Sequence, residues 1–236
     1  IVHPYEDSPG FWFGGGNMVE AADGTLYTSG RYRNQGDSRT GLKMGDRGLE
    51  LAVFESSDGG ESFHKLFSLG KEDLGTGGAS VLSIEGTALN FTGTGVELYV
   101  STEKTAPTYP QEVREFQKPG TGVWSIELLV ADSIEELKTA AVTPLLSSSN
   151  PEHLHLKDPV VHRDSMGNTV LIFCHHPFNW SSSNSAYCIR PRGGREFSPP
   201  NYRFFPRGST WDVAVSRISD LLTLPSDIAG EERSVQ

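Results

Sequence analysis

The sequence has few basic residues and no long apolar segment. Twenty Lys and Arg residues stand against 30 Asp and Glu residues, which gives a formal net charge of −10. This balance argues against a nucleic-acid partner, because binding to phosphates needs a basic face; a neutral sugar suits an acidic protein better. No stretch approaches the roughly 20 apolar residues that cross a bilayer. We therefore expect no membrane partner.

Cysteine is also scarce, and Cys174 and Cys188 are the only two in the chain. In an oxidising compartment they could pair across neighbouring strands, and otherwise they would remain two buried thiols. The sequence leaves both alternatives open. The chain starts at Ile1 without methionine, which is compatible with a removed leader. Localisation is therefore unknown, with a secreted or periplasmic protein as one interpretation.

Turn-forming residues are abundant, with 26 glycines and 14 prolines in 236 residues. So many turns favour short strands over long helices, and the predicted fold class is all-β. A chain of this length can bury one sizeable core, so we predict a single domain over 1–236. It divides into three similar units at roughly 10–70, 80–147 and 155–225.

Each unit is predicted to contain four strands in sequence. In the first unit a hairpin spans 17–33 and two strands follow at 49–56 and 62–69. The second has strands at 81–91, 96–104 and 123–133, one helical turn in SIEELKT and an edge strand in AVTPLL. The third has strands at 158–164, 169–177, in SAYCIRP and within 210–222.

A repeated four-stranded antiparallel meander is typical of a β-propeller blade. The inner strands start near Asn17, Glu85 and Asp158, a spacing of about 70 residues. Three blades cannot close a ring, because propellers typically have at least four. We therefore expect that remaining blades or a partner chain complete it. The alternative is a twisted β-sandwich.

One turn supports the propeller. Residues 56–63, SSDGGESF, fit the pattern Ser-x-Asp-x-Gly-x-(Ser/Thr)-(Trp/Phe) and resemble the Asp-box between the third and fourth blade strands of sialidase-like propellers. We expect Asp58 to accept hydrogen bonds from backbone amides, Gly60 to adopt positive φ and Phe63 to fill the blade core. This role is structural and not catalytic.

Polar residues recur where the inner strands begin. Asn17, Glu85 and Asp158 hold equivalent places, and the inner strands of a propeller converge on one axis. Cleavage of a glycosidic bond generally needs two carboxyl groups, one as acid and one as base or nucleophile. Glu85 and Asp158 are therefore the predicted catalytic pair, and Asn17 is a predicted substrate-binding residue.

Two short motifs carry a family resemblance. Lys157-Asp158-Pro159 is similar to the (Arg/Lys)-Asp-Pro motif, and Glu85-Gly86 to the Glu-Gly motif, of five-bladed propeller glycoside hydrolases of the arabinanase/xylosidase and invertase-type clans. The resemblance implies Glu85 as general acid and Asp158 as its carboxylate partner or pKa modulator. Two features depart from it: Asn17 stands where those families place an Asp, and the order of the two motifs is reversed.

Further residues are predicted to bind substrate. These are Arg31 and Arg33 in the first unit and His175, His176, Asn179 and Trp180 in the third. The arginines could orient hydroxyls or a carboxylate, and Trp180 could stack on a sugar ring. Ordinary alternatives are solvent-facing arginines, loop-anchoring histidines and a packing tryptophan. His153 and His155 should share one face of an extended chain, but no third ligand follows, so we predict no metal and no cofactor.

The leading functional hypothesis is a glycosidase that acts on a plant or algal oligosaccharide. Asn17 in place of an acid raises an alternative from another class, a non-catalytic carbohydrate-binding propeller. A third hypothesis, prompted by the Asp-box, is a sialidase-like hydrolase. That chemistry needs an arginine cluster, and Arg31, Arg33 and Arg39 lie too close together in sequence to indicate one.

Overall fold

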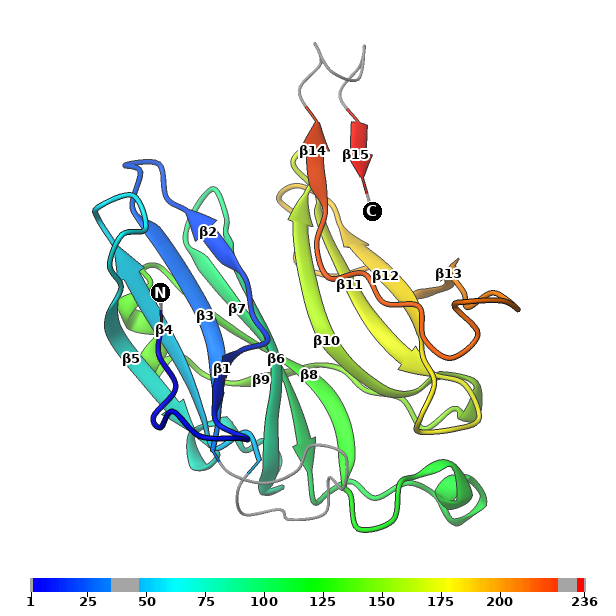
Figure 1. The fold of residues 1–236 in the computed structure, drawn as a ribbon. Helices are drawn as coiled ribbons and strands as arrows, with labels where there is room; N and C mark the ends of the chain where they lie inside the picture. Colours follow the sequence, from blue (N-terminus) through cyan, green and yellow to red (C-terminus); the bar gives the residue numbers. More distant parts are fainter. Residues whose placement is uncertain (1, 35–46, 225–232, 236) are drawn as a thin grey trace.

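The computed structural model describes residues 2–34, 47–224 and 233–235, and within these ranges the chain is built from strands and short 3₁₀ turns. Three antiparallel sheets follow one another along the chain and lie side by side (Figure 1). The fold class predicted from the turn content is confirmed. No helix in the described ranges is long and apolar enough to span a membrane.

The first sheet has an inner strand that is broken in two. β1 (Trp12–Gly14) and β2 (Met18–Glu20) both pair with β3 (Leu26–Arg33), and β4 (Glu50–Ser56) and β5 (His64–Gly70) complete the sheet. The predicted hairpin and the two strands after it are confirmed, while β1 was not expected. Glycines 14–16 span the break between β1 and β2.

The second sheet runs in chain order from the centre outwards. Its strands are β6 (Val81–Phe91), β7 (Val96–Lys104), β8 (Val123–Ala131) and β9 (Thr143–Leu146). The 3₁₀ turns η2 (Glu72–Leu74) and η3 (Gln111–Phe116) lie in the connections, and η4 (Glu135–Thr139) forms at the predicted place. All four predicted strands of this unit are confirmed.

The third sheet differs from the prediction at both ends. It consists of β10 (Leu154–Arg163), β11 (Thr169–His176), β12 (Asn184–Arg190) and β13 (Asn201–Phe205), preceded by η5 (Pro151–His153). The fourth strand predicted within 210–222 is wrong. The free edge of β12 is occupied by β13, so the later segment lies outside the sheet and touches it through the Ser183–Val215 bridge. β14 (Leu222–Leu224) and β15 (Arg233–Val235) form a separate ladder.

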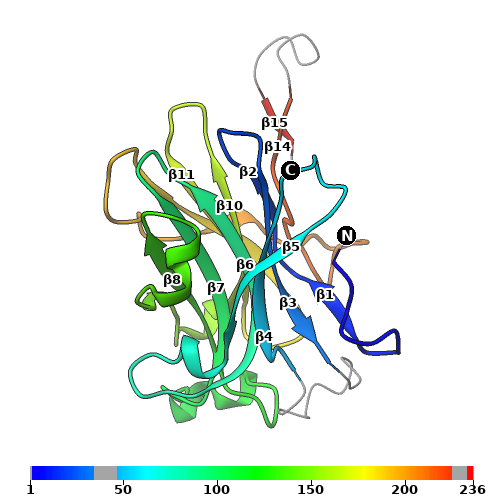
Figure 2. The same cartoon turned by 90° about the vertical axis from the view of Figure 1, so that its left-hand side faces the viewer.

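Neighbouring sheets share apolar cores. One cluster joins Leu51 and Phe67 of the first sheet to Leu89 and Leu98 of the second. Another joins the second and third sheets through side chains that include Tyr99, Ile126, Leu156 and Phe173. Figure 2, seen from the side of β5, shows the strands of the packed sheets running up and down the molecule. This packing places β6 between β3 and β10.

The turn at 56–63 has the expected hydrogen bonds. The amide of Ser62 donates to Asp58 Oδ1 over 3.0 Å, and Ser56 Oγ donates to the same oxygen over 2.7 Å. Gly60 has φ of 92°, and Phe63 packs against the buried cluster of the first sheet. Hydrogen bonds from Ser62 hold the pKa of Asp58 well below its usual range. The likeness to the Asp-box of sialidases remains a prediction.

The two cysteines lie on neighbouring strands as free thiols. Cys174 on β11 and Cys188 on β12 are both buried. Burial raises the pKa of each thiol to about 12. The structure therefore contains the second of the two alternatives, two buried thiols.

Candidate functional site

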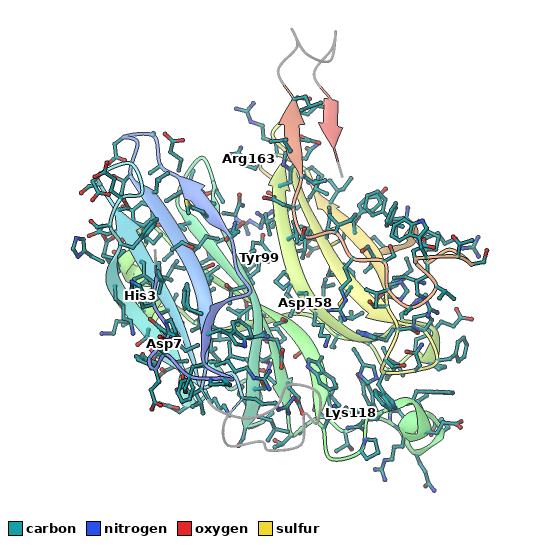
Figure 3. The ribbon with its side chains drawn as sticks, in the orientation of Figure 1. His3, Asp7, Tyr99, Lys118, Asp158 and Arg163 are labelled. Atoms are coloured by element: carbon teal, nitrogen blue, oxygen red, sulfur yellow. The ribbon has the colours of Figure 1, made fainter. Side chains whose placement is uncertain are left out.

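The inner strands β6 and β10 meet at Gly86 and Asp158. The pairing of β6 with β7 shifts between Ile84 and Thr87, and the pairing of β10 with β11 shifts between Lys157 and Val160. Asp158 itself has φ of 55°. These irregularities turn the chain where Glu85-Gly86 passes Asp158. Figure 3 shows Asp158 at this level of β10.

Ser101 links the two strands at this point. Its Oγ donates to the carbonyl of Gly86 over 3.2 Å and accepts the amide of Asp158 over 3.2 Å. Ser101 is fully buried. One hydroxyl therefore fixes the backbone next to both predicted catalytic residues.

Glu85 forms an ion pair with Arg31. Arg31 Nη1 lies 3.0 Å from Glu85 Oε2, and the two side chains are each only 14% exposed. Ser83 Oγ donates to Glu85 Oε1 over 2.8 Å, and the guanidinium of Arg31 lies 5.1 Å from the centre of the Trp12 ring. Arg31 and Ser83 therefore fix both oxygens of the Glu85 side chain.

A second glutamate lies behind Glu85. Glu103 is fully buried; its Oε2 lies 2.6 Å from Arg47 Nη2, and its Oε1 accepts the amide of Gly122 over 2.6 Å. Burial, together with the charge of Glu85, raises the pKa of Glu103. Glu103 and Arg47 were not predicted from the sequence, because nothing in either local pattern shows that they pair.

Asp158 has its own arginine. Arg217 Nη1 donates to Asp158 Oδ2 over 2.8 Å, and Arg217 Nε donates to Ser183 Oγ over 2.9 Å. Cys174 Sγ donates to Asp158 Oδ2 over 3.4 Å. Asp158 remains 34% exposed, so its carboxylate is open to solvent. Arg217 lies in the segment wrongly predicted as a strand, which explains why it was missed.

Asn17 binds the backbone of the next sheet. Its Nδ2 donates to the carbonyl of Leu89 over 2.9 Å, and its Oδ1 accepts the amide of Leu89 over 2.7 Å. Leu89 lies four residues beyond Glu85 on β6. The amide of Asn17 thus joins the first two sheets, and its predicted contact with substrate remains a prediction.

His176 and His175 face opposite sides of β11, as adjacent strand residues do. His176 lies on the same face of β11 as Cys174, two residues earlier, and Cys174 contacts Asp158. It is buried, and burial together with the charge of Lys157 lowers the pKa of His176 to about 2. His175 faces away from Asp158, so the structure does not bring both histidines to the carboxylates.

Three more predicted residues lie at the margins of the sheets. Arg33 pairs with Trp12 in the β1–β3 ladder and is partly buried. Asn179 Oδ1 accepts the amides of Ser181 and Ser182, which shapes the loop after β11. Trp180 is 44% exposed, and the centre of its ring lies 5.9 Å from Lys118 Nζ. Their roles in binding remain predictions.

The expectation that His153 and His155 share one face is wrong. His153 stacks on Tyr202, whereas the ring of His155 bonds to the hydroxyl of Tyr109. The cause is the backbone of His155, which has φ of 54° at an irregular point of β10. Among the described residues no group of three potential ligands could hold a metal ion.

Comparison with known proteins shows similarity at the level of the fold. No protein-family model and no curated protein matches the chain. Among solved structures, the GH43_1 enzyme from Xanthomonas citri in complex with xylotriose has a TM-score of 0.55 and 12% identity, covering 81% of this chain and 54% of that one. The β-xylosidase RS223 has a TM-score of 0.55 and 14% identity, covering 85% of this chain and 62% of that one.

These similarities establish the architecture. The chain forms about three four-stranded antiparallel blades of the five-bladed β-propeller type, and the β-sandwich alternative is wrong. The chain spans 54% and 62% of the two solved structures. At 12% and 14% identity the likeness concerns the fold alone.

Proposed function

We propose that this chain supplies the Glu85–Asp158 carboxylate pair of a glycoside hydrolase that cleaves a plant or algal oligosaccharide. The observation that carries the proposal is the meeting of β6 and β10. Two carboxylates of adjacent inner strands flank Gly86, and each is held by an arginine. Glycosidic bond cleavage generally uses such a pair.

The surroundings of each carboxylate bear on its role. Asp158 is the more open of the two and suits contact with a sugar hydroxyl or an attacking water. Glu85 forms an ion pair with Arg31, and this arrangement would let it act as a base or nucleophile without any rearrangement. For Glu85 to act as the general acid, Arg31 has to move away from it when the sugar binds, so that the glycosidic oxygen can take the place of the guanidinium.

A second candidate function is non-catalytic carbohydrate binding. It is favoured by the two ion pairs, because each arginine occupies an oxygen of the carboxyl group that would have to contact the glycosidic bond. The backbone hydrogen bonds of Asn17 also favour it. The sialidase-like hypothesis has no such support, since Arg31 already pairs with Glu85 and Arg39 lies outside the described residues.

Turnover of activated substrates distinguishes the two functions. The wild-type chain should hydrolyse an aryl xyloside or an aryl arabinofuranoside, and Glu85→Gln should lower kcat far more than it changes KM. Glu61→Gln, an exposed change in the turn at 56–63, is the control. Sugar binding without turnover in the wild type would favour the second candidate. A kcat in Glu85→Gln that equals that of the wild type, once corrected for the fraction of folded protein, would make Glu85 a structural residue.

A further inference from the structure

A cavity of about 620 Å³ lies at one end of the third sheet. Its walls come from η5, the end of β11, the start of β12 and the strand β13. They include His153, His175, Phe178, Asn184, Asn201 and Tyr202. Because His175 faces away from Asp158, this cavity is a different place from the junction of β6 and β10.

Imidazole nitrogens without partners distinguish this cavity. His175 is 2% exposed, and neither of its ring nitrogens has a hydrogen-bond partner among the described residues. The backbone of Glu152 and of Tyr202 lies beside the ring and partly offsets the lowering of the His175 pKa by burial, but neither group meets the geometry of a hydrogen bond. Nδ1 of His153 is likewise buried without a partner. A buried polar group that is left unpaired destabilises the folded protein, so a ligand that pairs it gains affinity.

Aromatic contacts hold these rings in place. His153 stacks on Tyr202 with ring centres 3.6 Å apart and planes at 3°. His175 lies edge-on to both rings, at 5.1 Å from His153 and 5.0 Å from Tyr202. Phe178 is 53% exposed beside them. The cavity therefore combines fixed polar atoms with apolar walls, as small-molecule sites usually do.

The protonation of the two histidines limits the class of ligand. Burial lowers the pKa of His153, and it lowers that of His175 to about 4. At neutral pH both rings are uncharged, and each offers one N–H donor and one acceptor nitrogen. The acidic residue Glu152 and the basic residue Arg203 also line the cavity. Their charges have opposite signs, so the lining has no net preference for an anion or a cation. A neutral ligand rich in hydroxyl groups matches this set, because a hydroxyl both donates and accepts.

We propose that this cavity is a second carbohydrate site, which binds a neutral oligosaccharide through His153 and His175. These nitrogens are buried in the free protein, so the imidazole rings would turn on binding to present them to a sugar hydroxyl. Tyr202 and Phe178 would cover the apolar face of the sugar. The proposal does not depend on hydrolysis at Glu85, so it holds whether or not the chain is an enzyme.

Titration with xylotriose, followed through the ring NMR signals of the histidines, tests the proposal. Xylotriose should shift the signals of His153 and His175 in a saturable manner. His175→Phe, which keeps an aromatic ring of similar size, should weaken binding at least tenfold. Phe178→Ala changes an exposed side chain and should weaken it severalfold without affecting folding. His64→Phe, at an exposed position of β5, is the matched control and should bind normally.

Three results would overturn the proposal. One is the absence of any shift at His175 with millimolar xylotriose or maltotriose. Another is loss of binding in Glu85→Gln but not in His175→Phe, which would put the sugar at the carboxylate pair. The third is a shift of both rings with zinc chloride but not with sugar, which would assign them to a metal ion.

Discussion

Gly86 lies against the backbone of Asp158. A β-carbon at Gly86 would come within 2.9 Å of the Asp158 Cα and 3.4 Å of Pro159 Cδ. The nearest of these atoms belongs to the backbone, which cannot move aside as a flexible side chain would. The glycine after Glu85 is therefore what allows the two inner strands to approach closely.

Gly86→Ala should consequently push β6 and β10 apart. We expect a loss of about 1–3 kcal/mol in the free energy of unfolding, the usual cost of overpacking, and a loss of any glycosidase activity. Gly93→Ala is the control, because a β-carbon there meets no atom within 4 Å and should change stability by less than about 0.5 kcal/mol. Chemical denaturation of both variants measures the difference. Equal stability of the two would contradict the close approach.

The ion pair between Arg31 and Glu85 should appear as an energetic coupling. Removing one partner leaves a largely buried charge without its counterion, so Arg31→Gln and Glu85→Gln should each destabilise the protein. The double variant should lose less than the sum, with a coupling of about 1–3 kcal/mol. A double-mutant cycle from urea unfolding measures this coupling. Additive losses would mean that the two side chains act independently.

Alternating apolar residues made most strands predictable. Strands such as β7 and β8 bury their side chains against neighbouring sheets, so their apolar patterns reflect the fold directly. β10 begins earlier than predicted because Leu154 already pairs with His176. Its irregular residues His155 and Asp158 have positive φ, which no propensity of His or Asp would indicate. β13 was missed because the fourth strand of the third unit was predicted within 210–222. Pairing with the edge of β12 selects β13 instead.

The proximity of the two predicted carboxylate residues has the same origin, and their catalytic roles remain predictions. Glu85 and Asp158 could be found because each interrupts an apolar strand, where a carboxylate is costly without a partner. Their partners could not be found in this way. Arg217 reaches Asp158 from 59 residues away, and Arg47 reaches Glu103 from 56 residues away. Such pairs depend on the path of the connecting loops rather than on any local pattern.

Asn17 provides a test of the contact between the first two sheets. Asn17→Ala removes both hydrogen bonds to Leu89 and leaves the buried amide and carbonyl of Leu89 unpaired. The free energy of unfolding should fall by about 1–3 kcal/mol. Asn17→Asp keeps the acceptor for the Leu89 amide but places a carboxylate oxygen against the Leu89 carbonyl, and should be at least as unstable. Thermal unfolding of both variants measures this. A large fall in sugar affinity with unchanged stability would instead show that Asn17 binds substrate.

Acid sensitivity should depend on His175. Its pKa is lowered to about 4 in the folded protein from about 6.5 in an unfolded chain. Between these values the unfolded state binds more protons, so stability falls as pH decreases from about 6.5 to 4. His175→Phe removes this contribution and should reduce the acid-induced loss by roughly 2–3 kcal/mol, although the other buried histidines still contribute. The measurement is the free energy of unfolding in urea at several pH values, with His64→Phe as the exposed control. An unchanged pH dependence in His175→Phe would mean that water reaches the ring in the folded protein and that His175 is not held neutral by burial.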